Sequence, residues 1–253
     1  MPNRITFINH ATVLIQVGDL NIITDPIYSR TVSFILPRLK PVGIPFDELP
    51  PIDVVLISHN HYDHLNLKTL RKIQRKFDPV IIVPHGVAKY GKRTGYKDVH
   101  EMNWGDHCIV KGARFSCVRA KHFSGRTLWD RNKSVFCGYV IEANGKTVYF
   151  AGDSGYGDFF TTLCNQFSID MALLPIGAYR PRQWFKGIHM NPEEAVQTFL
   201  DVKAKHLVPI HWGTFKISDE PMSEPPLLLR QAAEQEGLMD RVHILDNGGQ
   251  FDF

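Results

Sequence analysis

The stretch 58–66, SHNHYDHLN, places His59, His61, Asp63 and His64 within six positions. It continues directly from the apolar run DVVLIS at 53–58, which has the length and composition of a buried strand. Titratable groups that are buried together cost free energy unless a partner compensates their charges and lone pairs. The fold must therefore bring this cluster and its partners together at the carboxyl end of a strand, where we expect it to hold a metal.

Three more residues that can bind metals follow predicted strands in the same way: His122 after 114–120, Asp153 after 147–151 and His211 after 206–210. Together with the first cluster they make five imidazoles and two carboxylates. A tetrahedral zinc ion needs only four ligands, so the set predicts two metals with one bridging carboxylate. The donors are rich in nitrogen and lack thiolate, which favours Zn²⁺, with iron or manganese as alternatives.

Apolar runs of strand length recur along the chain and are separated by short polar turns. The predicted strands are 12–17, 20–24, 53–58, 80–84, 114–120, 134–141, 147–151, 170–175, 206–210 and 242–245. Gly18-Asp19 and Asn144-Gly145 predict tight hairpin turns.

Three segments have helical patterns, at 66–77, 192–203 and 225–236. The second has Asn191 as its N-cap and Pro192 at its first helical position. Helices interleave with strands, but tight turns join too many of the strands for a simple doubly wound sheet. We therefore expect an α/β fold in which layers of helices cover mixed sheets.

The 253 residues are enough for one large domain, and we expect a single domain over 1–253. The formal net charge of +3 does not require nucleic acid as a partner. Cys108, Cys117, Cys137 and Cys164 form no C-x-x-C pair, so we expect them to be reduced, buried thiols. With no signal peptide or membrane span in the pattern, we expect a cytoplasmic protein, with any contact to the inner membrane face being peripheral.

The sequence HNHYDH at 59–64 resembles the HxHxDH signature of the metallo-β-lactamase superfamily. GDSGY at 152–156 and the histidines at 122 and 211 are similar to that superfamily's later motifs. The resemblance implies a four-layer αβ/βα sandwich. It also implies that His59, His61 and His122 bind one zinc, that Asp63, His64 and His211 bind the other, and that Asp153 bridges them.

Longer stretches resemble the branch that hydrolyses N-acylphosphatidylethanolamine as a phospholipase D. These stretches are ELPPIDVVLISHNHYDHL, YFAGDSGY, LLPIGAYRPR with HMNPEEAV, and IHWGTF with EPP. The resemblance implies a phosphodiesterase that releases N-acylethanolamine and phosphatidic acid from a phospholipid. Segment 31–46 and FSGRTLWDRN after His122 differ from the better-known animal members, and these are segments that we expect to touch lipid.

Within this resemblance, Asp63, Asp153 and His189 are the residues that we expect to take part in the chemistry. Asp25 follows the strand at 20–24 and is a candidate acceptor for the ring N–H of a ligand histidine. The predicted substrate contacts are Tyr156, Tyr179, Arg180, Trp184 and His189. The remaining histidines are interpreted as structural: His10, His85, His100, His107, His206 and His243.

Several alternatives stay open. The same metals could open a lactone or another small ester, although Arg180, Arg182 and Lys186 favour a phosphate or other anionic ester substrate. A di-iron oxidoreductase of this type would carry glutamate in place of His61 and a flavin partner domain. The modest charge disfavours a nuclease, and a purely structural metal site rarely needs seven ligands. The apolar tip Val32–Leu36 is a candidate membrane anchor.

Overall fold

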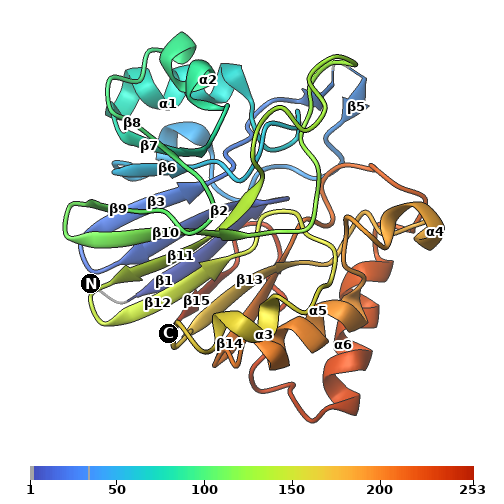
Figure 1. The fold of residues 1–253 in the computed structure, drawn as a ribbon. Helices are drawn as coiled ribbons and strands as arrows, with labels where there is room; N and C mark the ends of the chain where they lie inside the picture. Colours follow the sequence, from blue (N-terminus) through green and yellow to red (C-terminus); the bar gives the residue numbers. More distant parts are fainter. Residues whose placement is uncertain (1–2, 34) are drawn as a thin grey trace.

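Two mixed β-sheets face each other, and helices cover their outer sides, in the computed structural model (Figure 1). The structure describes residues 3–33 and 35–253. The first sheet has the order β15-β1-β2-β3-β6-β7-β8. Its strands are β1 (Arg4–Asn9), β2 (Thr12–Val17), β3 (Leu20–Thr24), β6 (Val54–Leu56), β7 (Val80–Pro84), β8 (Val99–Met102) and β15 (Gln250–Asp252).

The second sheet has the order β14-β13-β12-β11-β10-β9. Its strands are β9 (His107–Val110), β10 (Ala113–Arg119), β11 (Cys137–Ala143), β12 (Lys146–Phe150), β13 (Met171–Pro175) and β14 (His206–Ile210). A separate small hairpin joins β4 (Thr31–Val32) to β5 (Leu36–Pro37).

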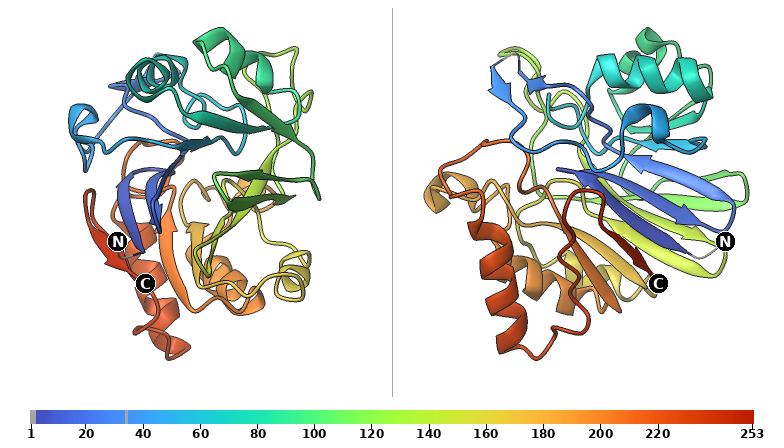
Figure 2. Two further views of the ribbon diagram at one scale, coloured as in Figure 1. Left: turned by 90° about the vertical axis from the view of Figure 1, so that its left-hand side faces the viewer. Right: turned by 180° about the vertical axis from the view of Figure 1, so that it is seen from behind.

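Helices lie on the outer side of each sheet, so the fold has four layers (Figures 1 and 2). The helices are α1 (Leu67–Phe77), α2 (Ala88–Thr94), α3 (Phe160–Leu163), α4 (Arg182–Phe185), α5 (Pro192–Asp201) and α6 (Glu224–Gln235), and a 3-10 turn spans Phe46–Glu48. Helices α1 and α2 cover the first sheet, whereas α3, α5 and α6 lie beside the second. The predicted αβ/βα sandwich is confirmed.

Strand β6 shows how the layers are held together. Val54 and Leu56 are fully buried in the large core between the sheets. Val55 and the following Ile57 are fully buried on the opposite face, in the cluster that contains Leu70 of α1. Successive side chains of a strand point to opposite faces, so the continuous apolar run of β6 packs against both the other sheet and a helix.

The helices predicted from sequence begin and end within two residues of the observed ones. At α5, Asn191 accepts a hydrogen bond from the Glu194 amide, and the Glu194 carboxylate accepts one from the Asn191 amide. This capping box satisfies amides that would otherwise have no partner at the helix start. The two predicted hairpins are also present, between β2 and β3 and between β11 and β12.

Some predictions were wrong. The segment 242–245 is not a strand and makes one isolated bridge, between Leu207 and Val242. The edge position of the first sheet is taken instead by β15, which pairs with β1. The strand predicted at 134–141 begins only at Cys137. All four cysteines are free thiols, as expected, but Cys108 and Cys164 are only partly buried.

The predicted apolar tip at 32–36 is less uniform than its sequence indicates. Val32 is buried against Ile27 and Phe215, so it belongs to the core. Ile35 is 79% exposed, and Phe34 lies outside the described residues. No helix in the described part of the chain is both long and apolar enough to cross a membrane.

Candidate metal centre

The sheet topology brings the predicted ligands together. In the first sheet β2 is antiparallel to both β1 and β3, and β3 is parallel to β6, so β1, β3 and β6 end at the same edge. In the second sheet β10, β12 and β14 share an edge for the same reason. The residues that follow these six strands are His10, Asp25, His59, His122, Asp153 and His211. They meet where the two edges converge.

The chain turns sharply after three of these strands. His10, Asp25 and His211 have φ values of +48°, +33° and +60°. Residues with a Cβ rarely adopt this left-handed region, which costs of the order of 1 kcal/mol or more. Such strained residues cluster at functional sites, and here each turn directs a polar side chain into the space between the sheet edges.

His59, His61 and His122 form the first group of donors. Nδ1 of His61 lies 2.8 Å from Nε2 of His59 and 3.2 Å from Nε2 of His122. Nδ1–H of His122 donates to the carbonyl of Ile188 at 2.8 Å, which leaves Nε2 as the lone pair that faces the group. Three imidazole nitrogens therefore face a common point.

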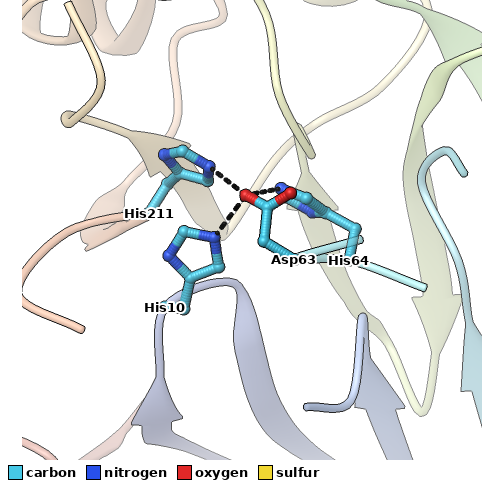
Figure 3. A group of neighbouring side chains, drawn as sticks. All are labelled: His10, Asp63, His64 and His211. Atoms are coloured by element: carbon cyan, nitrogen blue, oxygen red, sulfur yellow. Dashed lines mark hydrogen bonds and ion pairs between the residues drawn. The ribbon is translucent and has the colours of Figure 1, made fainter. Parts of the chain in front are cut away.

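The second group surrounds Asp63 (Figure 3). Its Oδ2 atom lies 3.4 Å from Nε2 of His64 and 3.5 Å from Nε2 of His211. Nε2–H of His10 donates to the same oxygen at 3.0 Å. Sequence reasoning treated His10 as structural and missed this contact. His10 directly follows β1, so the strand-end pattern would have revealed it had β1 been predicted.

Asp153 lies between the two groups. Its Oδ2 atom is 3.9 Å from Nε2 of His59 and 3.7 Å from Nε2 of His122 in the first group. The same atom is 3.1 Å from Nε2 of His64 and 3.2 Å from Nε2 of His211 in the second. One carboxylate oxygen thus contacts nitrogens of both groups, which is the position that a bridging ligand requires.

Asp25 is hydrogen-bonded to a histidine of the second group directly and to one of the first group through Ser58. The sequence predicted such a contact with one ligand histidine. Its Oδ2 atom accepts from Nδ1–H of His64 at 2.7 Å and from the Ser58 hydroxyl at 2.6 Å. Its Oδ1 atom accepts from the Ser58 amide at 2.7 Å. The Ser58 hydroxyl in turn accepts from Nδ1–H of His59 at 2.9 Å. Such outer partners fix the tautomer and orientation of ligand histidines, and here they leave both Nε2 atoms free.

Burial and neighbouring charges shift the pKa values of the histidines in the cluster in opposite directions. Burial lowers the pKa of His122 to about 3, and burial also lowers the pKa of His59 and His61. Burial alone would lower the pKa of His64 as well, but the carboxylates of Asp153 and Asp63 raise it well above its usual value. Burial therefore holds the pKa of the rings in the first group below its usual value, whereas the carboxylates of Asp153 and Asp63 act in the opposite direction on His64.

The donors fit divalent metals. Nε2 of His64 and Nε2 of His211 are buried, yet neither makes a hydrogen bond of acceptable geometry within the described residues. Oδ1 of Asp153 and Nδ1 of His189 also lack such a partner there. An unsatisfied buried polar atom costs about 1–3 kcal/mol, and bound metals would use the lone pairs of His64, His211 and Asp153. The cluster reaches the surface at His61 and Asp63, which are partly exposed and so provide access.

His189 lies at the cluster, as its predicted role requires. It is buried, its Nδ1 atom is 4.0 Å from Oδ2 of Asp153, and its ring centroid is 4.9 Å from that of His122. Among the described residues, Tyr156 and Trp184, two of the other predicted substrate contacts, are engaged or exposed away from the cluster. The Tyr156 hydroxyl donates to Asp201 at 2.7 Å, and Trp184 is 71% exposed on α4.

The cations expected to favour phosphate are largely engaged elsewhere. Arg180 forms an ion pair with Glu224 at 2.9 Å, and the Tyr179 hydroxyl donates to the same carboxylate. Arg182 forms an ion pair with Glu194 at 2.7 Å. Carboxylates therefore neutralise two of the three cations, which weakens the argument for phosphate that rested on them.

Comparison with known proteins identifies the family. A model described as the beta-lactamase superfamily domain matches residues 20–212. The chain belongs to this superfamily. A solved structure of Igni18, a metallo hydrolase from Ignicoccus hospitalis, superimposes with a TM-score of 0.78 over all of both chains at 23% identity, which supports the same fold.

Two curated relatives of the chain share one description. The N-acyl-phosphatidylethanolamine-hydrolyzing phospholipase D 1 of Caenorhabditis elegans is 33% identical over 93% of this chain. The mitochondrial enzyme of the same description from Saccharomyces cerevisiae is 35% identical over 90%. The chain spans 69% of the worm protein, 51% of the yeast protein and 64% of a 36% identical protein from Mycobacterium tuberculosis.

Proposed function

We propose that this superfamily member is a zinc-dependent phosphodiesterase of phospholipase D type, which converts N-acylphosphatidylethanolamine-like lipids to N-acylethanolamine and phosphatidic acid. The observation that carries the proposal is the position of Asp153, whose Oδ2 atom contacts histidines of two separate donor groups. That arrangement supports a dinuclear hydrolytic centre. The names of the worm and yeast relatives support the lipid substrate.

In this proposal His59, His61 and His122 hold one zinc, while Asp63, His64 and His211 hold the other and Asp153 bridges. When bound, a zinc pair lowers the pKa of a water molecule and offsets negative charge on phosphate oxygens. The nitrogen-rich donor set favours zinc, with iron or manganese as alternatives.

The side chains have separate tasks. Asp153 orients the attacking water through its second oxygen, Oδ1, which has no hydrogen-bond partner among the described residues. His10 fixes one oxygen of Asp63, and Asp25 fixes His64, so neither ligand has to reorganise during the reaction. His189 offers an unpartnered Nδ1 atom at the cluster and would contact a substrate oxygen.

The predicted contacts farther out remain part of the proposal. Arg180 keeps a side chain that is 48% exposed despite its ion pair, so it can still meet an anionic substrate. Tyr156, Tyr179 and Trp184 would line the approach to the cluster. We also propose that the protein contacts the cytoplasmic face of the membrane peripherally and has no nucleic-acid partner.

The experiment is lipid mass spectrometry on zinc-loaded protein. Wild type and the Asp63→Asn variant are incubated with mixed N-acylated and ordinary phospholipids, and with simple lactones in a parallel sample. Asp78→Asn is the matched control because Asp78 is an exposed residue at the end of α1.

We expect wild type and the control to consume N-acylated phospholipid and release phosphatidic acid. Asp63→Asn should lose more activity than the ten- to hundredfold typical of outer metal partners. Consumption of lactone without any phospholipid would instead establish the small-ester alternative. Phospholipid turnover that survives in Asp63→Asn would refute the assigned role of that carboxylate.

A further inference from the structure

A second feature lies next to the metal centre and plays no part in the chemistry above. A groove of about 620 Å³ runs between the β4–β5 hairpin and α1. It borders the motif that carries the ligands, since Tyr62 and Asn66 both line it. Six cations also line this groove, which we call the cationic groove: Arg30, Lys68, Arg71, Lys72, Arg93 and Arg126.

The cations of the cationic groove are not paired with carboxylates. The described residues that line it include no aspartate or glutamate. None of the six cations forms an ion pair with a carboxylate of the described residues, whereas Arg180, Arg182 and Lys205 each do. The carboxylate of the nearby Asp130 accepts hydrogen bonds from the backbone amides of Arg126 and Thr127 in its own loop. A concentration of one sign of charge in a concave surface attracts an ion of opposite sign.

Two further details concern the field in the cationic groove and its position beside the metal centre. Leu67 and Lys68 line the groove and are the first residues of the eleven-residue helix α1, so the positive end of its dipole adds to the field. Arg126 is partly buried and donates to the carbonyl of Asn60 inside the metal-binding motif and to that of Leu65 directly after it. One side chain thus connects the cationic groove to the loop that carries His61, Asp63 and His64.

The segments that flank the cationic groove also expose large apolar side chains. Ile35, in the β4–β5 hairpin, is 79% exposed. Leu128 and Trp129 are 93% and 82% exposed, and they belong to the same loop as Arg126. Both segments lie at one end of the molecule, at the upper right of Figure 1. Exposed tryptophan and aliphatic side chains beside a cluster of cations are typical of a surface that enters a lipid headgroup layer.

We infer that the cationic groove binds the phosphates of anionic phospholipids at a bilayer surface while Ile35, Leu128 and Trp129 enter the headgroup layer. The inference rests on the proposed function, because it explains how the metal centre would meet a lipid that stays in its membrane. A free phosphate has the same charge chemistry, but it would gain nothing from the apolar side chains. We therefore commit to the lipid surface.

The test is co-sedimentation of zinc-loaded protein with phosphatidylcholine vesicles, with and without phosphatidylglycerol. The groove variant is Arg71→Glu with Arg93→Glu. The matched control is Lys203→Glu with Arg230→Glu, which changes the net charge equally at two exposed cations away from the groove. A third variant, Leu128→Ser with Trp129→Ser, removes apolar contacts without changing charge.

We expect wild type and the control to bind the vesicles that contain phosphatidylglycerol. Each cation near such a surface raises the affinity roughly fivefold. The groove variant loses two cations, so it should bind at least about thirtyfold more weakly. The apolar variant should also bind more weakly, and salt should weaken the binding of wild type. Circular dichroism and turnover of a soluble phosphodiester should be unchanged in the groove variant, which separates binding from folding and chemistry.

Equal vesicle binding by the groove variant and the control would overturn the inference. Equal binding of wild type to vesicles with and without phosphatidylglycerol would also overturn it. Saturable binding of inorganic phosphate or single-stranded RNA without vesicle binding would overturn it too. The failures are distinguishable. Phospholipid turnover in detergent without vesicle binding would leave the proposed function standing and refute only the groove. Groove-dependent vesicle binding without turnover of any phospholipid would support the groove and refute the proposed substrate.

Discussion

Asp25→Asn is the substitution that most sharply tests how the metal centre is held in place. Asp25 is fully buried and accepts hydrogen bonds from the ring of His64 and from both the amide and the hydroxyl of Ser58. Asparagine has the same shape but carries one donor group in place of an acceptor oxygen. In either orientation of the amide, its NH₂ faces a group that also donates.

The cost follows from these contacts. If the amide nitrogen replaces Oδ2, two bonds to a charged acceptor are lost, each contributing about 1.5–3 kcal/mol. The Ser58 hydroxyl can rotate and accept from the new amide, so the loss for His64 dominates. We expect the free energy of unfolding to fall by about 2–3 kcal/mol. Zinc affinity should fall ten- to a hundredfold, as is typical for outer partners of metal ligands.

Urea unfolding and competition with a fluorescent zinc chelator measure the two effects separately. Asp78→Asn is the control, because Asp78 is exposed and adopts the left-handed conformation that asparagine tolerates. The reasoning would be refuted if Asp25→Asn unfolded and bound zinc like the control. It would be refuted in part if stability fell while zinc affinity stayed the same, since Asp25 would then support the fold and not the ligand.

Two other substitutions test neighbouring parts of the account. Gly152→Ala should destabilise by more than about 2 kcal/mol, because φ is +60° and a Cβ there would lie 2.5 Å from Cβ of Ser58. Gly145→Ala, with φ of +71° and no atom within 4 Å, should lose only about 1 kcal/mol, and equal losses by urea unfolding would contradict the clash. His10→Ala should lower zinc affinity about tenfold or more by freeing Asp63, whereas the exposed His107→Ala should not, and chelator competition decides between them.

Much of the site could be predicted because its residues follow a simple pattern. His59, His122, Asp153 and His211 each follow an apolar run, and strands that run in one direction deliver such residues to one edge. The same logic found Asp25, whose contact with His64 is confirmed. The resemblance to the superfamily added the division of the ligands into two groups, and the structure shows two corresponding groups of donors.

The pattern failed where long-range pairing decides the outcome. Segment 242–245 is apolar enough for a strand, but β15 takes the edge beside β1, and periodicity says nothing about which segment finds a partner. His10 was missed because β1 was not recognised as a strand. The cationic groove was missed because its six cations come from four separate segments of the chain, which only the fold brings together.

The central claim is that this fold assembles two metal sites that share Asp153. Elemental analysis of pure, active protein by inductively coupled plasma mass spectrometry tests it most directly, with His122→Ala and His211→Ala measured beside wild type. We predict about two zinc ions per chain in wild type, and about one in each variant because each removes a ligand from a different site. One zinc or none in active wild-type protein would contradict the dinuclear centre.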